Sequence, residues 1–487
     1  MFKLKTELKP QKNKLTSFFP INTKDRKGIF DWDIVLGHFV RYAYRKSVAS
    51  DQFEQFKLKC KENFESILDE AQFWQHLESM YFSGDELYKI SPELLLFKAQ
   101  DIKGSSANKR LGDLFLNLLQ EHHLQKSPSL SLNFLEKELV ETFNSFTFSG
   151  SKAGTVSKAP TETPYLPFLR DLFVQDLDFI ASKPKYFIEN ITDFLKLYTF
   201  LYTAQITLNL SEWKAGPPSP KPCYFILDTE KASDERSYVK SYGYRQLANN
   251  FDKVFPYLAM NESLQDPGAV KQPLWAVNCL ESTQAVLEQL NTYAAEFKDE
   301  RQLLLEINEA TKVEDAIENL LLLSHAQFKR GESRHEVNVH YCKAIESELC
   351  GHFVQSRGRS GRVLVLNQDY ILLLTNIVIG NRERLRLHEL LVEFEARGLS
   401  FDKQTQKVLV GFYERIGNVE RMSDSGDAVY VRKSYFRPFT LKRRVTYQSK
   451  KWIFLLFKLA LLSFWSSYIA KRKVKAVVKT SFLTFVM

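Results

Sequence analysis

The chain contains 487 residues, a length that corresponds to about three domains and excludes a lone binding module. Hydrophobic residues make up 44% and charged residues 26%, as in soluble globular proteins, which excludes a disordered or fibrous chain. The 38 Phe and 21 Tyr, set against only 19 Gly and 16 Pro, favour packed helices over a turn-rich β architecture.

The formal net charge of +9 belongs to the C-terminal end of the chain. Residues 434–487 contain 12 Lys and Arg but no Asp or Glu, whereas the rest has 55 basic and 58 acidic residues. The charge of the body therefore does not indicate nucleic-acid binding. The five cysteines are odd in number and mostly far apart, and no apolar run follows the N-terminus. These features predict a cytoplasmic protein without disulfides or a secretory signal.

Residues 1–148 are predicted to form an N-terminal helical domain. The first fifteen residues are rich in lysine and are expected to be frayed. Beyond them, apolar residues recur at helical spacing, and Asn133 with Glu136 three residues later forms a capping-box pattern. The predicted helices are 31–45, 111–121 and 134–146. The polar residues 148–164 are predicted to be a linker or a long loop.

Residues 165–333 are predicted to form a central helical domain. Four prolines within 211–222 interrupt the helical periodicity, and the short apolar run 223–227 that follows is typical of a buried strand, although it is short enough to begin a helix. The predicted helices are 167–182, 186–208, 282–297, 301–310 and 313–330.

Residues 335–433 are predicted to form a C-terminal winged helix-turn-helix with a small β-hairpin wing. After a strand at 362–366, the pattern predicts three helices that end at Gly380, Gly398 and Gly417, the third capped by Ser400 or Asp402. Two strands, 419–422 and 428–432, are joined by residues 423–427, which tolerate positive φ. The predicted fold class is therefore mainly α, with a multi-domain helical body and this winged helix.

Two groups of residues are candidates for DNA contact. Arg357, Arg359 and Arg362 form a glycine-containing loop that suits phosphate binding, although it suits a solvated β turn equally well. The exposed face of the third helix offers Lys403, Gln406 and Lys407 to phosphates or bases. Residues 369–433 contain ten basic and ten acidic side chains, so docking to a protein is the alternative role of the winged helix.

Catalytic and metal-binding patterns are weak. The stretch 150–158 has its glycines and lysines in the wrong order for a phosphate-binding loop. A run of histidines and cysteines lacks the close cysteine pair of a structural zinc site; its members are His335, His340, Cys342, Cys350 and His352. Asp228 and Glu230 suggest a nuclease site, but Lys231 follows Glu230 directly and would point to the opposite face of a strand. We therefore expect no cofactor, no metal site and no catalytic residues.

The basic, apolar segment 434–487 has three interpretations. Residues 452–470 contain a single charge, Lys458, and are just long enough to span a bilayer. Basic residues flank this segment on both sides, so the positive-inside rule does not predict its orientation in a membrane. The absence of acidic residues instead favours out-of-frame translation, and a buried helix is the third interpretation.

Several short motifs resemble the DptG family, the G component of the DNA phosphorothioation-dependent restriction system DptFGH, also called DndFGH. The motifs are residues 369–376 (DYILLLTN), 382–386 (RERLR), 394–398 (FEARG), 423–427 (SDSGD), 18–21 (FFPI), 30–33 (FDWD) and 225–230 (FILDTE). The resemblance covers roughly residues 1–433 and rests on structural rather than catalytic motifs.

The resemblance implies a bacterial anti-phage defence role beside two larger partners. In that system DptF and DptH carry the ATPase and helicase-like activities, and the complex attacks DNA whose backbone lacks phosphorothioate. The family has no established catalytic residues to transfer to this chain. The sequence therefore predicts a non-catalytic, cytoplasmic subunit that docks these partners and contacts double-stranded DNA through the winged helix. The alternatives are a metal-dependent nuclease subunit and, if the tail is genuine, a membrane-tethered regulator.

Overall fold

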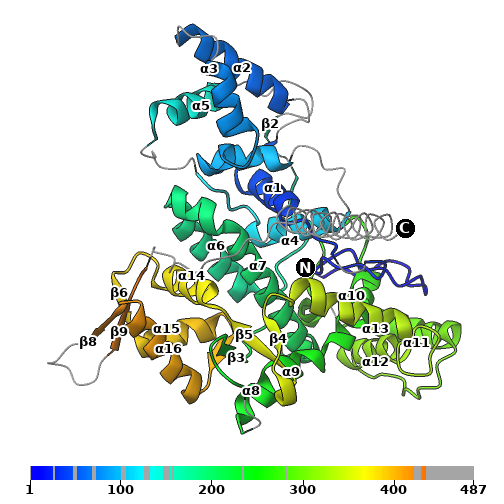
Figure 1. Ribbon diagram of the computed structural model, residues 1–487. Helices are drawn as coiled ribbons and strands as arrows, with labels where there is room; N and C mark the ends of the chain where they lie inside the picture. Colours follow the sequence, from blue (N-terminus) through cyan, green and yellow to red (C-terminus); the bar gives the residue numbers. More distant parts are fainter. Residues whose placement is uncertain are drawn as a thin grey trace, which may run out of the picture. The chain divides into compact units, whose positions relative to one another are not determined.

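The computed structural model describes residues 2–25, 28–47, 52–67, 73–99, 106–125, 132–145, 154–155, 158–232, 235–280, 282–421 and 429–434. The chain divides into two compact units, Met1–Tyr435 and Phe436–Met487, and the described residues all belong to the first. They are mainly helical, with small sheets (Figure 1). Within these ranges none of the helices combines the length and apolarity of a membrane span. The predicted span 452–470 lies outside them.

The N-terminal segment is packed, which corrects the expectation that it is frayed. Phe2, Leu8 and Leu15 are at most 8% exposed. Lys5 N–H donates to the Leu264 carbonyl at 2.9 Å, which holds the backbone against the rest of the unit. The lysines of this segment alternate with apolar residues, so an extended chain can bury the apolar side chains while the lysines reach solvent.

The first helices are α1 (Trp32–Ala43), α2 (Gln52–Ile67), α3 (Phe73–Leu77), α4 (Ser106–Leu119) and α5 (Phe134–Ser145). Asp31 caps α1 by accepting hydrogen bonds from the backbone N–H groups of Asp33 and Ile34. Helices α1 and α4 approach closely at Gly112, where an added Cβ would lie 2.6 Å from His38 Cβ. Two-residue strands β1 (Lys46–Ser47) and β2 (Gly154–Thr155) pair in antiparallel fashion.

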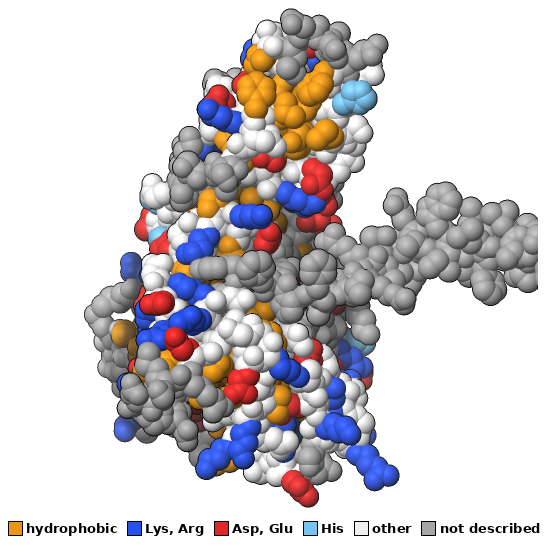
Figure 2. All heavy atoms as spheres, turned by 60° about the vertical axis from the view of Figure 1, so that its left-hand side comes forward, with side chains coloured by type: hydrophobic (Ala, Val, Ile, Leu, Met, Phe, Trp, Pro, Cys, Tyr) orange, Lys and Arg blue, Asp and Glu red, His pale blue; other side chains and the backbone are white. Residues whose placement is uncertain are grey.

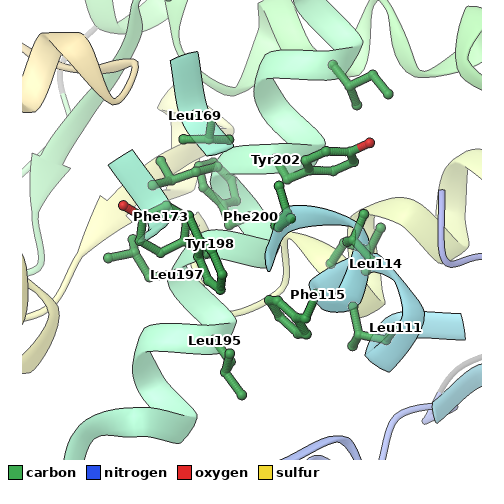
Figure 3. Close-up of a cluster of buried hydrophobic side chains, with 14 of the residues drawn as sticks. Leu111, Leu114, Phe115, Leu169, Phe173, Leu195, Leu197, Tyr198, Phe200 and Tyr202 are labelled. Carbon is green, nitrogen blue, oxygen red and sulfur yellow. The ribbon is translucent and has the colours of Figure 1, made fainter. Parts of the chain in front are cut away.

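Two long helices, α6 (Pro167–Ala181) and α7 (Pro184–Asn209), organise the core, and both begin with proline at the first helical position. Phe173 of α6 stacks on Phe115 of α4, with ring centroids 6.0 Å apart, and meets Tyr198 of α7 edge to face at 5.0 Å. Leucine side chains of α4, α6 and α7 surround these rings (Figure 3). This aromatic cluster holds the first helices of the chain against the centre of the unit.

A second group of helices follows: α10 (Phe251–Leu264), α11 (Gln284–Arg301), α12 (Val313–Ala326) and α13 (His335–Ala344). The helix expected at 301–310 is absent, which corrects that prediction: α11 ends at Arg301 and Gln302 adopts a left-handed conformation (φ 55°). Residues 303–310 are non-helical, and the side chain of Asn291 bonds both backbone groups of Ala310. Tertiary hydrogen bonds thus replace the helical ones.

A four-stranded sheet joins distant parts of the chain. Its order is β4 (Val354–Ser356), β5 (Arg362–Leu366), β3 (Cys223–Leu227) and β7 (Leu399–Phe401). Strand β3 is parallel to both β5 and β7, and β4 is antiparallel to β5. The strands predicted at 223–227 and 362–366 are confirmed. Because β3 lies between strands of the segment 335–433, the predicted central and C-terminal domains share one sheet.

The two faces of this sheet pack differently. On one face Ile226, Val363 and Val365 pack with Val239 of the short helix α8 (Ser237–Tyr242), which is followed by α9 (Tyr244–Ala248). Phe225, on the neighbouring position of β3, meets Phe200 of α7 edge to face. The sheet therefore lies between the long central helix and a thin layer formed by α8 and α9.

The C-terminal part of the unit contains α14 (Gln368–Ile379), α15 (Leu387–Ala396) and α16 (Lys403–Arg415), with strands β6 (Arg384–Arg386), β8 (Val419–Arg421) and β9 (Val429–Arg432). The order of the antiparallel sheet is β6-β9-β8. Gly380, Gly398 and Gly417 have positive φ where helix ends were expected, and Asp402 caps α16. The predicted turn 423–427 lies outside the described residues.

Candidate nucleic-acid interface

The arginine loop connects the antiparallel strands β4 and β5. Arg357 N–H donates to the Gly361 carbonyl at 2.7 Å, and Gly358 and Gly361 both have positive φ. The side chain of Arg357 turns towards the body, where its Nη2 donates to the Asp228 carbonyl at 2.9 Å. Ser360 Oγ donates to the Ala232 carbonyl at 3.0 Å. The loop is therefore attached to the segment that follows β3.

The other two loop arginines are exposed and differ in their partners. Arg362 forms an ion pair with Glu346 and donates to the Tyr244 hydroxyl at 3.1 Å, while 53% of its side chain remains exposed. For Arg359 the described part of the chain provides neither an ion pair nor a side-chain hydrogen bond. Arg359 is thus the loop side chain best placed to meet an external phosphate, and Arg362 is partly neutralised.

A hollow of about 260 Å³ lies beside this loop. Arg362 lines it together with Lys240 of α8 and Arg245 of α9, while Val239 and Val363 contribute apolar surface. Lys240 and Arg245 are not among the contact residues predicted from the sequence. The interleaving of Tyr238, Lys240 and Tyr242 in the sequence is the signal by which this basic, aromatic region can be found.

Lys403 and Lys407 lie on the exposed face of α16, as their spacing predicts. Gln406 is half-buried, and its side-chain amide donates to the Phe401 carbonyl at 2.9 Å. The two lysines are therefore free to contact phosphates, whereas the amide of Gln406 is engaged within the protein. Within the described part, the lysines do not lie next to the arginine loop. Strands β5 and β7 are both parallel to β3, the loop precedes β5, and α16 follows β7. The loop and α16 therefore lie at opposite ends of these strands.

The N-terminus of α16 is closed by a buried ionic network. Asp402 accepts from Thr405 N–H and from Arg236, whose Nε lies 2.8 Å from Asp402 Oδ2. Arg236 also bonds Glu230 at 2.8 Å, and both of these residues are 6% exposed. Burial by itself would raise the pKa of the Asp402 carboxyl, but hydrogen bonds and the charge of Arg236 lower it overall. The network anchors α16 to the end of β3.

A second basic surface lies on the sheet β6-β9-β8. Arg384 and Arg432 both pair with Glu420, and Arg386 Nε donates to the Tyr430 hydroxyl at 3.0 Å. The guanidinium groups of Arg384 and Arg386 also lie over the Tyr430 ring. Arg384 and Arg432 share one glutamate, and Arg386 has no ion-pair partner among the described residues, so this surface keeps a positive charge. Helix α16 contacts β8 of the same sheet.

The carboxylates suggested for a nuclease site are not arranged around a metal. Glu230 accepts hydrogen bonds from Leu227 N–H and from Arg236. Asp228 Oδ1 is buried and has no hydrogen-bond partner among the described atoms. In the same part of the chain no three His, Cys, Asp or Glu side chains are grouped to hold a metal ion. His335 bonds the Phe328 carbonyl, and His352 packs against Trp32.

Comparison of the sequence with protein-family models and with curated proteins gives no match.

One face of the molecule has a mixed surface (Figure 2). Lys and Arg side chains are interspersed with Asp and Glu over most of this face, and hydrophobic side chains gather at its upper end, where α2 and α3 lie in Figure 1. Leu58 and Ile67 of α2 and Met80, just after α3, are each about half exposed or more. This face therefore has no broad positive surface for DNA, and the candidate DNA contacts are local groups of basic side chains.

Proposed function

We propose that the chain is a non-catalytic, cytoplasmic subunit of a phosphorothioation-dependent DNA restriction complex that acts in anti-phage defence. The proposal starts from the motifs that resemble DptG. The stretch 369–376 lies in α14, 382–386 includes β6, and 394–398 ends α15. These motifs therefore fall on consecutive elements of one part of the unit.

The order of elements supports a winged helix in this part of the chain. Helix α14, strand β6, helices α15 and α16, and strands β8 and β9 follow one another, and β6 completes the small sheet. The connection between α15 and α16 contains β7, which pairs with β3. The proposed winged helix is thus joined through a strand to the rest of the first unit.

One observation carries the proposal of DNA contact: Lys403 and Lys407 are exposed on α16, a helix that contacts β8 of the small sheet β6-β9-β8. Lysines one helical turn apart are suited to phosphates of the DNA backbone, which position a protein without reading sequence. Because the N-terminal turn of α16 is capped by Asp402, we place the contacts on the outward face of the helix.

The helical body supplies the surface for the ATPase and helicase-like partners DptF and DptH. The hydrophobic side chains that gather at the upper end of one face (Figure 2) support this role, since clustered exposed apolar groups mark protein contacts. The alternative of a metal-dependent nuclease is less favoured, because Arg236 engages Glu230.

The test is isolation of the tagged chain from its native host under mild salt. We expect two larger chains to co-purify, one of them with a phosphate-binding loop, and we expect the complex to retain duplex DNA. Recovery of the chain alone, or DNA cleavage by the purified chain with a divalent metal, would contradict the proposal.

A further inference from the structure

A second hollow lies between the N-terminal segment and the helices α10 and α11. Its volume is about 170 Å³. Residues of the N-terminal segment form one wall, and Met260, Ser263 and Tyr293 are part of the other. The hollow exists only because the segment is packed rather than frayed, so sequence patterning alone does not indicate it.

Four lysines line this hollow: Lys5, Lys12, Lys14 and Lys271. In the described part of the chain none of them forms an ion pair. Lys12 and Lys14 are exposed, whereas Lys271 is only 9% exposed. Like charges gathered at a partly desolvated site repel one another, and the repulsion is relieved when an anion binds.

Among the described residues that line the hollow, the one carboxylate is that of Glu262, and it is already engaged. Glu262 accepts from the backbone and hydroxyl groups of Thr16 and Ser17, with the Thr16 nitrogen at 2.6 Å. It therefore fastens the N-terminal segment to α10. Its single negative charge leaves the lysines in excess around the hollow.

The backbone of Lys271 is held in place, and its ammonium group has an uncharged partner. Its N–H donates to the Thr161 carbonyl at 2.9 Å, and its carbonyl accepts from Thr163 N–H at 2.8 Å. Its Nζ donates to the backbone carbonyl of Asp266 at 2.5 Å. Burial lowers the pKa of Lys271; Glu262 and Asp266 act in the opposite sense, and Lys5 and Lys14 lower the pKa further.

We propose that this hollow is an anion site that binds a phosphate group through Lys5, Lys14 and Lys271. Its volume is below the ~300–1,000 Å³ of pockets that enclose drug-sized ligands, so only a small anionic group enters. The Tyr293 hydroxyl, which lies 3.3 Å from Ser263 Oγ, adds a neutral donor. The phosphate group is either free or part of a nucleic-acid backbone. The site is separate from α16 and does not depend on the function proposed above.

The experiment measures binding of inorganic phosphate and pyrophosphate to the full chain by calorimetry at constant chloride and in a buffer without phosphate. We expect saturable binding. The variants Lys271→Met and Lys14→Ala should each bind about tenfold more weakly, as expected for loss of one charge-assisted hydrogen bond. Lys14 is exposed, so its variant should fold normally even if Lys271→Met does not.

The matched control is Lys3→Ala, which removes the same charge from the same segment outside the lining of the hollow. It should bind like the wild type. A short oligonucleotide tests the source of the phosphate. If the oligonucleotide competes with pyrophosphate for the wild type, and Lys14→Ala weakens this competition, the site binds a backbone phosphate. If the oligonucleotide does not compete, the site binds a free anion. Absence of saturable binding by the wild type, or equal weakening by Lys3→Ala, would overturn the proposal.

Discussion

Arg397, at the end of α15, forms a two-pronged ion pair with Asp176 of α6 in the interior of the protein. Nε and Nη2 of the guanidinium lie 2.9 and 2.7 Å from the two carboxylate oxygens. Each residue is 1% exposed, and the Tyr198 hydroxyl also donates to Asp176. The pair spans 221 positions of sequence and joins the C-terminal helices to the central ones.

Replacing Arg397 with Met should destabilise the protein by ~3–5 kcal/mol, because Asp176 is left charged and without its ionic partner in the interior. Denaturant unfolding measures this change. Lys59→Met is the control, since Lys59 and Glu62 form an exposed pair on α2, worth ~0–1 kcal/mol. A loss for Arg397→Met no larger than that of the control would contradict the prediction.

Reversing both charges in Lys403→Glu/Lys407→Glu should weaken binding of non-specific duplex DNA strongly. Each phosphate contact that is lost should also lower the slope of log affinity against log salt by about one unit. The measurement is a binding titration at several salt concentrations.

The control for this pair is Lys59→Glu/Lys61→Glu on α2, which changes the net charge by the same amount elsewhere on the unit. It should leave both affinity and slope nearly unchanged. If the two double variants behave alike, α16 makes no specific phosphate contact, and the helix belongs to a protein-docking surface.

Glu162 should make stability depend on pH. The residue is 7% exposed, and burial raises its pKa from 4.5 to about 8, although the Phe18 N–H partly opposes the shift. Between pH 4.5 and 8 the folded protein therefore retains a proton that the unfolded chain has lost. The free energy of unfolding falls as pH rises through this window, by up to ~1.4 kcal/mol per pH unit.

Glu162→Gln removes this titration, so the difference in stability between pH 5 and pH 8 should shrink. Denaturant unfolding at several pH values tests this. Glu65→Gln, at an exposed position of α2, should keep the wild-type dependence. An unchanged pH profile in Glu162→Gln would show that this carboxyl is not responsible.

We expect Ser434 to be needed for the full stability of the first unit. Its N–H donates to Asn376 Oδ1 at 3.0 Å, and its carbonyl accepts from Asn376 Nδ2 at 2.7 Å; Asn376 is 1% exposed. A chain that ends at Tyr435, next to the boundary between the two compact units, should keep the stability of the first unit. A chain that ends at Lys433 should lose ~1–3 kcal/mol, because the buried amide of Asn376 loses both hydrogen bonds to Ser434 and keeps the one to the Tyr186 hydroxyl. Equal unfolding transitions for the two truncated chains would contradict this prediction.

Local signals in the sequence determined much of the secondary structure. The apolar runs 223–227 and 362–366 are the strands β3 and β5, and the glycines at 380, 398 and 417 lie where helices end. Asp402 caps α16, and Lys403 and Lys407 lie on the exposed face of this helix. Periodicity, capping and glycine conformation act over a few residues, so these features can be predicted from the sequence without knowing what packs against them.

Tertiary structure decided everything that depends on partners far apart in the sequence. Strand β7 has three residues and forms because β3, 176 positions earlier, offers an edge. The helix expected at 301–310 does not form, and the side chain of Asn291 hydrogen-bonds the backbone of Ala310 instead. The lysine-rich N-terminus is ordered by buried apolar contacts, and only that packing brings Lys14 and Lys271 around one hollow. The sequence shows that these residues are lysines. Their proximity arises from burial and hydrogen bonds that form only when the distant segments meet.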